Sequence, residues 1–426
     1  MTDINPTTST PADGPRKGSL FIIFLCVFID LLGFGIVLPL LPLYGRQFSV
    51  DESGLVLGLL MASFSAMQFL FAPWWGRLSD RIGRRPVLLI GLGGSTVFYG
   101  LFGVATIWES LTGLFIARIG AGIAGATIST AQAYIADTTT LEKRTHGMAL
   151  IGAAFGLGFT FGPLFGFLAV PTGDGNPGPG PGYAAAALSG LALLFAWFKL
   201  PESLHEKSAS ASKKHLDLGV FRQVLSTPSV ASLLLTLFIC VFAFANFETT
   251  LALIIKDKDG AFHFTFREVC LTFTFIGLVL TVAQGFIVRR LSKYFADVPV
   301  ATVGAGLEIV GFGYMSYACD VQSVKQLFIA LGIVVTGFAM LMPTLNSLIS
   351  RRSNPESQGG VLGLSQSISA LARIIGPVVG IPLLHQHADY PLYLAAGLMV
   401  CGAGLIFYAG VRGQDFIPDS VPSTEG

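Results

Sequence analysis

The stretch GRLSDRIGRRP at Gly76–Pro86 carries five charges and lies between two long apolar runs. Charged residues make up only 12% of the 426-residue chain, so four arginines and an aspartate in one short stretch are unusual. A tight, positively charged hairpin between apolar runs is typical of a cytoplasmic loop that joins two membrane spans. The stretch therefore predicts a protein that crosses a membrane several times.

The overall composition agrees with this prediction, because 52% of the residues are hydrophobic and the mean hydropathy is +0.69. Crossing ~30 Å of hydrocarbon takes about 20 apolar residues, and in lipid each span must bond its own backbone groups as a helix. The sequence thus predicts an all-α membrane protein with twelve transmembrane helices, at residues 20–44, 53–75, 87–108, 111–136, 146–170, 183–200, 229–255, 266–288, 298–319, 325–349, 359–384 and 391–411.

The positions of lysine and arginine predict the orientation of the chain, since short positively charged loops stay in the cytoplasm. With the N-terminus inside, most of the 26 Lys and Arg residues lie on the cytoplasmic side. The outer loops hold only Arg46, Lys256, Lys258, Arg267 and Lys325. We therefore expect both chain ends in the cytoplasm.

The polar segment 201–228 divides the apolar chain into two halves, residues 20–200 and 229–411, flanked by polar tails at 1–19 and 412–426. The first tail reads as a disordered cytoplasmic segment, because it is polar and rich in proline and threonine. We expect 201–228 to be a cytoplasmic linker between two six-helix halves.

The two halves repeat short motifs at nearly the same offset. Leu114–Ala117 and Leu327–Ala330 both read LFIA, and Gly-Pro-x-x-Gly occurs at Gly162–Gly166 and again at Gly376–Gly380. Duplicated halves around a central substrate site are how one large group of secondary transporters is built. The glycines and prolines expected to shape these helices for close packing are Gly158, Gly162, Pro163, Gly166, Gly376, Pro377 and Gly380.

Several motifs resemble those of a known family. GRLSDRIGRRP is similar to the loop signature G-x-x-x-D-R-x-G-R-R of the major facilitator superfamily. GLGFTFGPLFG at Gly156–Gly166 and ARIGAGIAGA at Ala117–Ala126 resemble the span 5 and span 4 motifs of its proton-driven exporters, with Arg118 as the buried arginine. AYIAD at 133–137 and LPES at 200–203 resemble the tetracycline/proton antiporter branch. The resemblance covers nearly the whole apolar chain and implies the major facilitator fold.

The charged hairpin is interpreted in two ways. A positive cluster that only fixes topology accounts for Arg81, Arg84 and Arg85, but it does not account for Asp80 between two glycines. Asp80 could also begin a helix and accept its free N–H groups, and Asp137 is a candidate partner for Arg77 or Arg81. We therefore expect a latch that closes the cytoplasmic face, made of Gly76, Arg77, Asp80, Arg81, Gly83, Arg84, Arg85 and Asp137.

Ionisable residues at membrane depth are costly and mark functional sites. Of 25 acidic residues only Asp30, Glu248 and Glu308 lie well inside spans, together with Arg118 and Arg373. A carboxyl group in hydrocarbon holds a proton more tightly than in water, so it can exchange one near neutral pH. The proton-coupling candidates are Asp30, Glu308, Glu248 and Arg118, and the resemblance matches Asp30 and Glu308 with family acids. The alternative is permanent ion pairs, Arg373 with Glu308 and Arg118 with Asp30.

Polar residues at depth could bind a substrate or bridge helices. The candidates for the substrate cavity are Arg373, Asn246, Gln132 and Gln366. Tetracycline exporters carry an aspartate in span 3 where this chain has Phe98, which argues against tetracycline as the substrate. Aromatic residues such as Phe64 and Tyr99 favour an apolar cavity instead.

The chain shows no P-loop, no paired histidines at ligand spacing and no nucleophile with a nearby base. We therefore expect no enzyme activity, cofactor, metal or nucleic-acid partner. The sequence predicts a monomeric secondary transporter in the lipid bilayer that exports a small, partly hydrophobic organic compound in exchange for protons. A metabolite importer or a facilitative uniporter with structural ion pairs is the alternative. A compact exporter of this type would suit the cell membrane of bacteria.

Overall fold

The computed structural model describes residues 17–48, 53–139, 141–172, 177–204, 228–256, 262–352 and 358–412. The predicted tails, except for a few residues at their inner ends, and most of the linker 201–228 lie outside this part of the chain. Within it, eleven segments are helical, long and apolar enough to span a membrane, and Ala153–Ala169 is a shorter apolar helix. The prediction of an all-α protein with twelve spans is confirmed.

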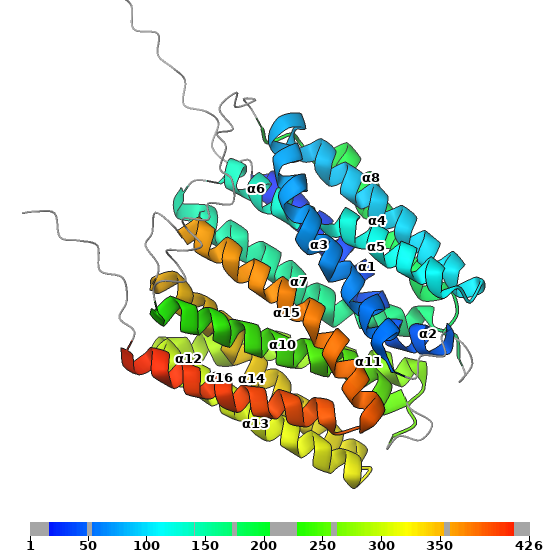
Figure 1. Ribbon diagram of the computed structural model, residues 1–426. Helices are drawn as coiled ribbons and strands as arrows, with labels where there is room; N and C mark the ends of the chain where they lie inside the picture. Colours follow the sequence, from blue (N-terminus) through cyan, green and yellow to red (C-terminus); the bar gives the residue numbers. More distant parts are fainter. Residues whose placement is uncertain are drawn as a thin grey trace, which may run out of the picture.

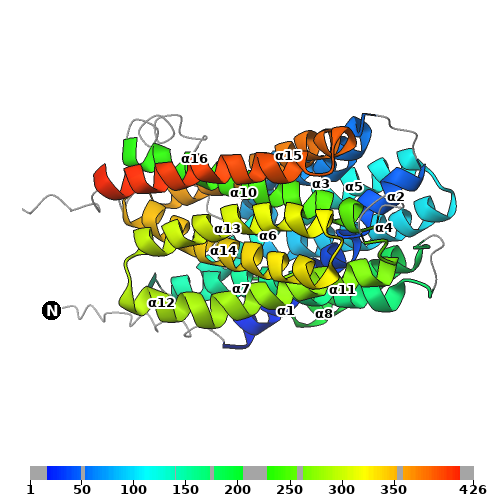
Figure 2. The same cartoon turned by 90° about the horizontal axis from the view of Figure 1, so that it is seen from below.

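The helices form two bundles (Figure 1). In both views they run roughly along one common direction (Figure 2). The first bundle contains α1 (Lys17–Val37), α2 (Leu41–Phe48), α3 (Leu55–Ile82), α4 (Arg84–Ile107), α5 (Leu111–Gly125), α6 (Ile128–Thr138), α7 (Leu141–Ala169) and α8 (Gly180–Lys199). The second contains α10 (Pro228–Lys256), α11 (Phe266–Val282), the π-helix η1 (Ala283–Val288), α12 (Arg289–Tyr294), α13 (Asp297–Asp320), α14 (Val324–Arg351), α15 (Gln358–Gln386) and α16 (Tyr390–Arg412).

We call the end of the molecule that carries Arg84, Arg289 and Arg352 the basic face, and the other end the opposite face. The bundles meet mainly through α3 against α15 and α7 against α11. Gly58 of α3 lies against the backbone of Pro377 in α15, and the hydroxyl groups of Thr160 and Thr281 share a hydrogen bond of 2.9 Å. These contacts lie between the middle of the bundle and the opposite face.

The repeated Gly-Pro motif allows close helix packing in both bundles. In α7, a Cβ on Gly162 would come within 2.6 Å of the Gly35 Cα in α1. In α15, a Cβ on Gly380 would collide with the amide of Asn246 in α10. Each motif therefore lets the first and fifth long helices of its bundle approach closely, and this equivalence gives the duplicated halves a physical basis.

The contact at Gly162 gives a stability prediction. We expect Gly162→Ala to lower the free energy of unfolding by about 1–3 kcal/mol, because backbone rather than a flexible side chain occupies the space of the new methyl group. Gly156→Ala is the matched control in the same helix, since a Cβ there meets nothing within 4 Å. Thermal unfolding of both variants in detergent checks this. Equal loss in the two variants would contradict the packing role of Gly162.

The turn between α3 and α4 is much shorter than the hairpin predicted at Gly76–Pro86. Helix α3 continues to Ile82, α4 begins at Arg84, and only Gly83 is not helical. Gly83 has φ +108°, a conformation that favours glycine. Gly76 is accommodated inside α3 and no proline follows it before Gly83, so the charges from Arg77 to Arg81 lie on the last turns of a helix and do not mark its end.

Candidate functional site

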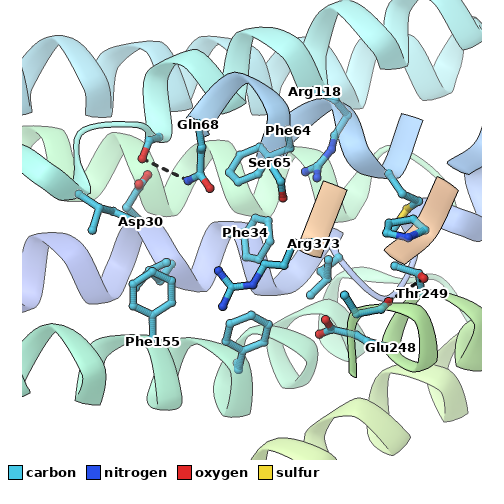
Figure 3. A pocket seen from close by; sticks show the side chains of 18 of the residues that line it. Asp30, Phe34, Phe64, Ser65, Gln68, Arg118, Phe155, Glu248, Thr249 and Arg373 are labelled. Atoms are coloured by element: carbon cyan, nitrogen blue, oxygen red, sulfur yellow. Dashed lines mark hydrogen bonds between the residues drawn. The ribbon is translucent and has the colours of Figure 1, made fainter. Parts of the chain in front are cut away.

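A cavity lies between the two bundles, and the empty space in it and in the solvent at its mouth amounts to about 820 Å³. Figure 3 shows side chains from α1, α3, α5, α7, α10 and α15 around it. Its charged lining residues are Asp30, Arg118, Glu248 and Arg373. Its aromatic lining residues are Phe34, Phe64, Tyr99, Phe155 and Phe159.

Asp30 of α1 is held at the wall of the cavity by hydroxyl groups. Ser189 Oγ of α8 donates a hydrogen bond of 3.2 Å to Asp30 Oδ1, and Ser95 of α4 is a second polar neighbour. The carboxyl group therefore has neutral partners. No ion pair joins it to Arg118 in the described part of the chain, so the alternative of a permanent Arg118–Asp30 pair receives no support here.

Arg118 of α5 is 2% exposed, and its guanidinium lies over aromatic rings. The Cζ atom is 4.5 Å from the Phe64 ring centroid and 5.8 Å from that of Phe34. Among the described residues, Nε and Nη1 have no hydrogen-bond partner. The group is thus a buried cation that faces the cavity with donors unused (Figure 3).

Glu248 of α10 and Arg373 of α15 bring an acid and a base to the cavity from the second bundle. The two charges interact electrostatically, although no ion pair between them appears among the described contacts. The alternative pairing of Arg373 with Glu308 is likewise not found there. The cavity therefore holds two acids and two guanidinium groups, one of each from each bundle.

Glu308 of α13 lies outside this cavity. Its side chain is 0% exposed and packs against Gly337 of α14, and neither carboxyl oxygen has a hydrogen-bond partner in the described residues. An ionised carboxylate without a donor or counter-ion costs several kcal/mol. This environment suits an uncharged group, so the geometry separates Glu308 from the other three proton-coupling candidates.

We expect Glu308→Gln to change the free energy of unfolding by less than about 1 kcal/mol, because the amide fills the same volume without adding charge. Transport should continue at the wild-type rate, since no route from this side chain to the cavity is seen in the described residues. Thermal unfolding and substrate flux in reconstituted vesicles measure both effects. Loss of pH-driven flux in the folded variant would return Glu308 to the proton pathway.

The other cavity candidates from the sequence do not line this space. Asn246 is 0% exposed, and its Nδ2 donates a hydrogen bond of 2.8 Å to the Pro391 carbonyl oxygen, which ties α10 to α16. Gln132 of α6 and Gln366 of α15 are also absent from the lining. Asn246 therefore bridges two helices, and Gln132 and Gln366 do not line the cavity in this conformation.

Gln68 of α3 does line the cavity, and its Nε2 donates a hydrogen bond of 3.3 Å to the Gly125 carbonyl oxygen (Figure 3). Gln68 is not among the cavity candidates chosen from the sequence. The signal that identifies it is periodic, because Met61, Phe64, Ser65 and Gln68 are spaced as one face of a helix and all line the cavity. Phe98 packs against Gly120 instead, away from the lining.

At the basic face, Arg84 is the centre of the predicted latch. Its Nη1 lies 2.6 Å from Asp80 Oδ1, and its Nε lies 3.0 Å from Asp137 Oδ2. The sequence suggested Arg77 or Arg81 as the partner of Asp137, but the structure places both on the exposed side of α3. Asp80 does not begin a helix; it lies in the last turn of α3, one turn from Arg84.

Glu202 takes the capping role that the sequence offered to Asp80. Its carboxylate accepts hydrogen bonds from the backbone N–H groups of Arg84 at 2.9 Å and Arg85 at 3.1 Å. These N–H groups have no partner within α4, so an acid from the segment after α8 satisfies them and favours the helix dipole. The Arg85 Nη2 group also donates to the Trp197 carbonyl oxygen at 2.6 Å. The start of the linker is thereby attached to the α3–α4 turn.

Comparison with known proteins agrees with this architecture. The family model described as the Major Facilitator Superfamily matches residues 23–377 and 233–417. The chain belongs to the Major Facilitator Superfamily. Tetracycline resistance protein class E of Escherichia coli is 32% identical over 85% of this chain and 86% of that protein.

Solved structures of the Major Facilitator Superfamily also match. The crystal structure of the human organic anion transporter MFSD10 is 27% identical, covers 92% of this chain and 100% of that one, and has a TM-score of 0.69. A D-xylose–proton symporter has a TM-score of 0.76 at 16% identity, covering 95% of this chain and 100% of that one, and supports the fold alone. The chain is thus a transporter of this superfamily, and its relatives differ in what they carry.

Proposed function

We propose that this transporter exports a small, partly hydrophobic organic compound in exchange for protons, by alternating access. One observation carries the proposal: Asp30 and Glu248 line the same cavity as five aromatic side chains. A positively charged group on the compound and a proton compete for the same carboxylates, and such competition couples two fluxes in opposite directions. Asp30 is the leading proton carrier and Glu248 the second, with Arg118 modulating them.

The packing of the bundles supports a cavity that opens toward the basic face. Gly58, Thr160 and Gly277 make close contacts between the bundles, and all lie from the middle of the molecule to the opposite face. If the basic face is cytoplasmic, as positively charged loops predict, this is the inward-facing form. In it, the ion pairs of Asp80 and Asp137 lie within the first bundle. The latch would engage the second bundle in the outward-facing form.

The proposed location is a cell membrane, with both chain ends in the cytoplasm and the protein acting as a monomer. The tetracycline resistance relatives come from bacteria such as Escherichia coli, which supports a bacterial inner membrane. Arg84, Arg289, Arg290, Lys293, Arg351 and Arg352 gather at the basic face, as expected for the cytoplasmic side.

A second candidate function is uptake of a metabolite, either together with protons or by facilitated diffusion. It is favoured by Arg118 and Arg373, because two guanidinium groups in one cavity attract negatively charged metabolites. Uptake by facilitated diffusion would continue after the pH gradient is collapsed, whereas exchange with protons would not.

Everted membrane vesicles with an acid interior test the proposal even while the substrate is unidentified. A pH-sensitive dye is followed while lipophilic cations, tetracyclines and anionic metabolites are added one at a time. We expect at least one compound to release protons from the vesicles, and no release from vesicles without the protein. Silence across the panel with folded, inserted protein would favour the uptake alternative.

A further inference from the structure

The guanidinium group of Arg118 lacks partners that a buried cation needs. Among the described residues it has no ion pair, and its Nε and Nη1 groups have no hydrogen-bond acceptor. The rings of Phe34 and Phe64 are its closest electrostatic support. Cation–π contacts offset only part of the cost of desolvating an unpaired ion. A negatively charged acceptor on a ligand in the cavity would supply the missing hydrogen bonds and counter-charge.

A second guanidinium group faces the same space from the other bundle. Arg373 of α15 lines the cavity, and no ion pair to it is found in the part of the chain that the structure describes. Arg118 belongs to α5 and Arg373 to α15, so a ligand that contacts both would join the two bundles. Guanidinium groups bind carboxylates and sulfonates through paired, charge-assisted hydrogen bonds.

We propose that the cavity recognises its substrate by a negatively charged group, a carboxylate or sulfonate on an aromatic body, which Arg118 binds with the help of Arg373. The aromatic body fits among the rings of Phe34, Phe64, Phe155 and Phe159, which line the cavity around the two cations. This inference rests on the proposed transport function and adds the chemical class of the substrate.

The proposed exchange with protons then restricts the substrate further. The groups in the cavity that can bind or release a proton are Asp30, Glu248 and Tyr99, beside the two arginines. A bound negative group and a bound proton reinforce one another in such a space, so a purely negative substrate would move together with protons. Exchange requires that the same molecule also carry a basic group, which displaces the proton from Asp30 or Glu248. The substrates that are exported are therefore aromatic zwitterions.

Three naphthyl compounds of similar size separate these charges: 1-naphthylacetate as the anion, 1-naphthylmethylamine as the cation and 1-naphthylalanine as the zwitterion. Their binding to the purified full-length protein in lipid nanodiscs is measured by equilibrium dialysis. We expect Arg118→Gln to weaken the binding of 1-naphthylacetate and of 1-naphthylalanine by about tenfold or more, which is the cost of one charge-assisted contact. The affinity for 1-naphthylmethylamine should change by less than about twofold. Arg118→Lys should fall between. Lys325→Gln, which removes an exposed cation at the start of α14, should change nothing.

Unchanged affinity of Arg118→Gln for both acids would overturn the proposal, and so would the lack of saturable binding of either acid to folded wild-type protein. If Arg118→Gln does not fold, Arg373→Gln should show the same loss for the acids alone. A pH dye in the same samples tests the proposed exchange separately. Proton release on binding of 1-naphthylalanine supports the exchange. Proton uptake would contradict the exchange, and if Arg118→Gln still weakens the binding of the acids, the proposed anion site stands without it.

Discussion

Asp30→Asn is expected to reduce pH-driven transport to the rate of vesicles that lack the protein. Asparagine keeps the shape of the side chain, and Ser189 can still donate its hydrogen bond to the Oδ1 position. The amide cannot bind and release a proton, so the coupling is lost while the cavity remains. Dye-monitored proton release from everted vesicles, driven by any transported compound, measures this effect.

The same variant should still exchange labelled for unlabelled substrate across the membrane with no pH gradient, at a higher half-saturating concentration. That reaction needs no proton, and Glu248 still offers a carboxylate to the basic group of the substrate. Asp320→Asn is the control, since Asp320 is an exposed acid at the end of α13. Asp30→Asn with wild-type pH-driven transport would mean that Asp30 is a structural polar group bound to Ser189. Loss of substrate exchange as well would mean that the substitution damages the cavity and not the coupling alone.

Arg84→Gln is expected to have the second large effect, on both stability and transport. Arg84 is 7% exposed and lies within ion-pair distance of Asp80 and Asp137, so its loss leaves two carboxylates at the basic face without their shared cation. Breaking a buried pair costs about 3–5 kcal/mol, but the two acids are partly exposed, so we expect about 2 kcal/mol. Thermal unfolding in detergent measures this loss.

In the proposed outward-facing form the latch also engages the second bundle, so its loss disfavours that form in particular. A cost of about 2 kcal/mol to one form alone changes the ratio of the two forms by about thirtyfold, enough to make transport slow. Arg81→Gln is the matched control, because Arg81 is an exposed arginine in the last turn of α3, three residues before Arg84. It should behave as wild type in both measurements. Equal loss of stability and transport in the two variants would show that only the total positive charge of this face matters. That result would favour the interpretation of the hairpin as a positive cluster that only fixes topology.

Most of the fold could be predicted because membrane spans depend on local composition. The predicted span 229–255 corresponds to α10 at Pro228–Lys256, and 298–319 corresponds to α13 at Asp297–Asp320. The charged hairpin was the exception. Its charges lie at one end of the first bundle, but a helix can continue through a charged segment, and α3 does so as far as Ile82.

The candidate site was predictable only in part. Asp30, Arg118, Glu248 and Arg373 share one property that a sequence displays, an ionisable group inside an apolar run, and the structure gathers all four around one cavity. Glu308 displays the same property yet faces Gly337 inside the second bundle, because α13 packs against α14 and α16 and contributes no residue to the cavity lining. The cap that Glu202 provides for Arg84 joins residues far apart in the chain, so no local pattern predicts it.

The central claim is that protons and substrate move in opposite directions through the cavity of Asp30 and Glu248. The most direct test uses purified protein in sealed proteoliposomes at zero membrane potential, with a substrate identified in the dye assay. With the substrate at equal concentration on both sides and an imposed pH gradient, the account predicts net substrate movement toward the acidic side, and reversal when the gradient is reversed. Net movement toward the alkaline side, or none, would contradict it.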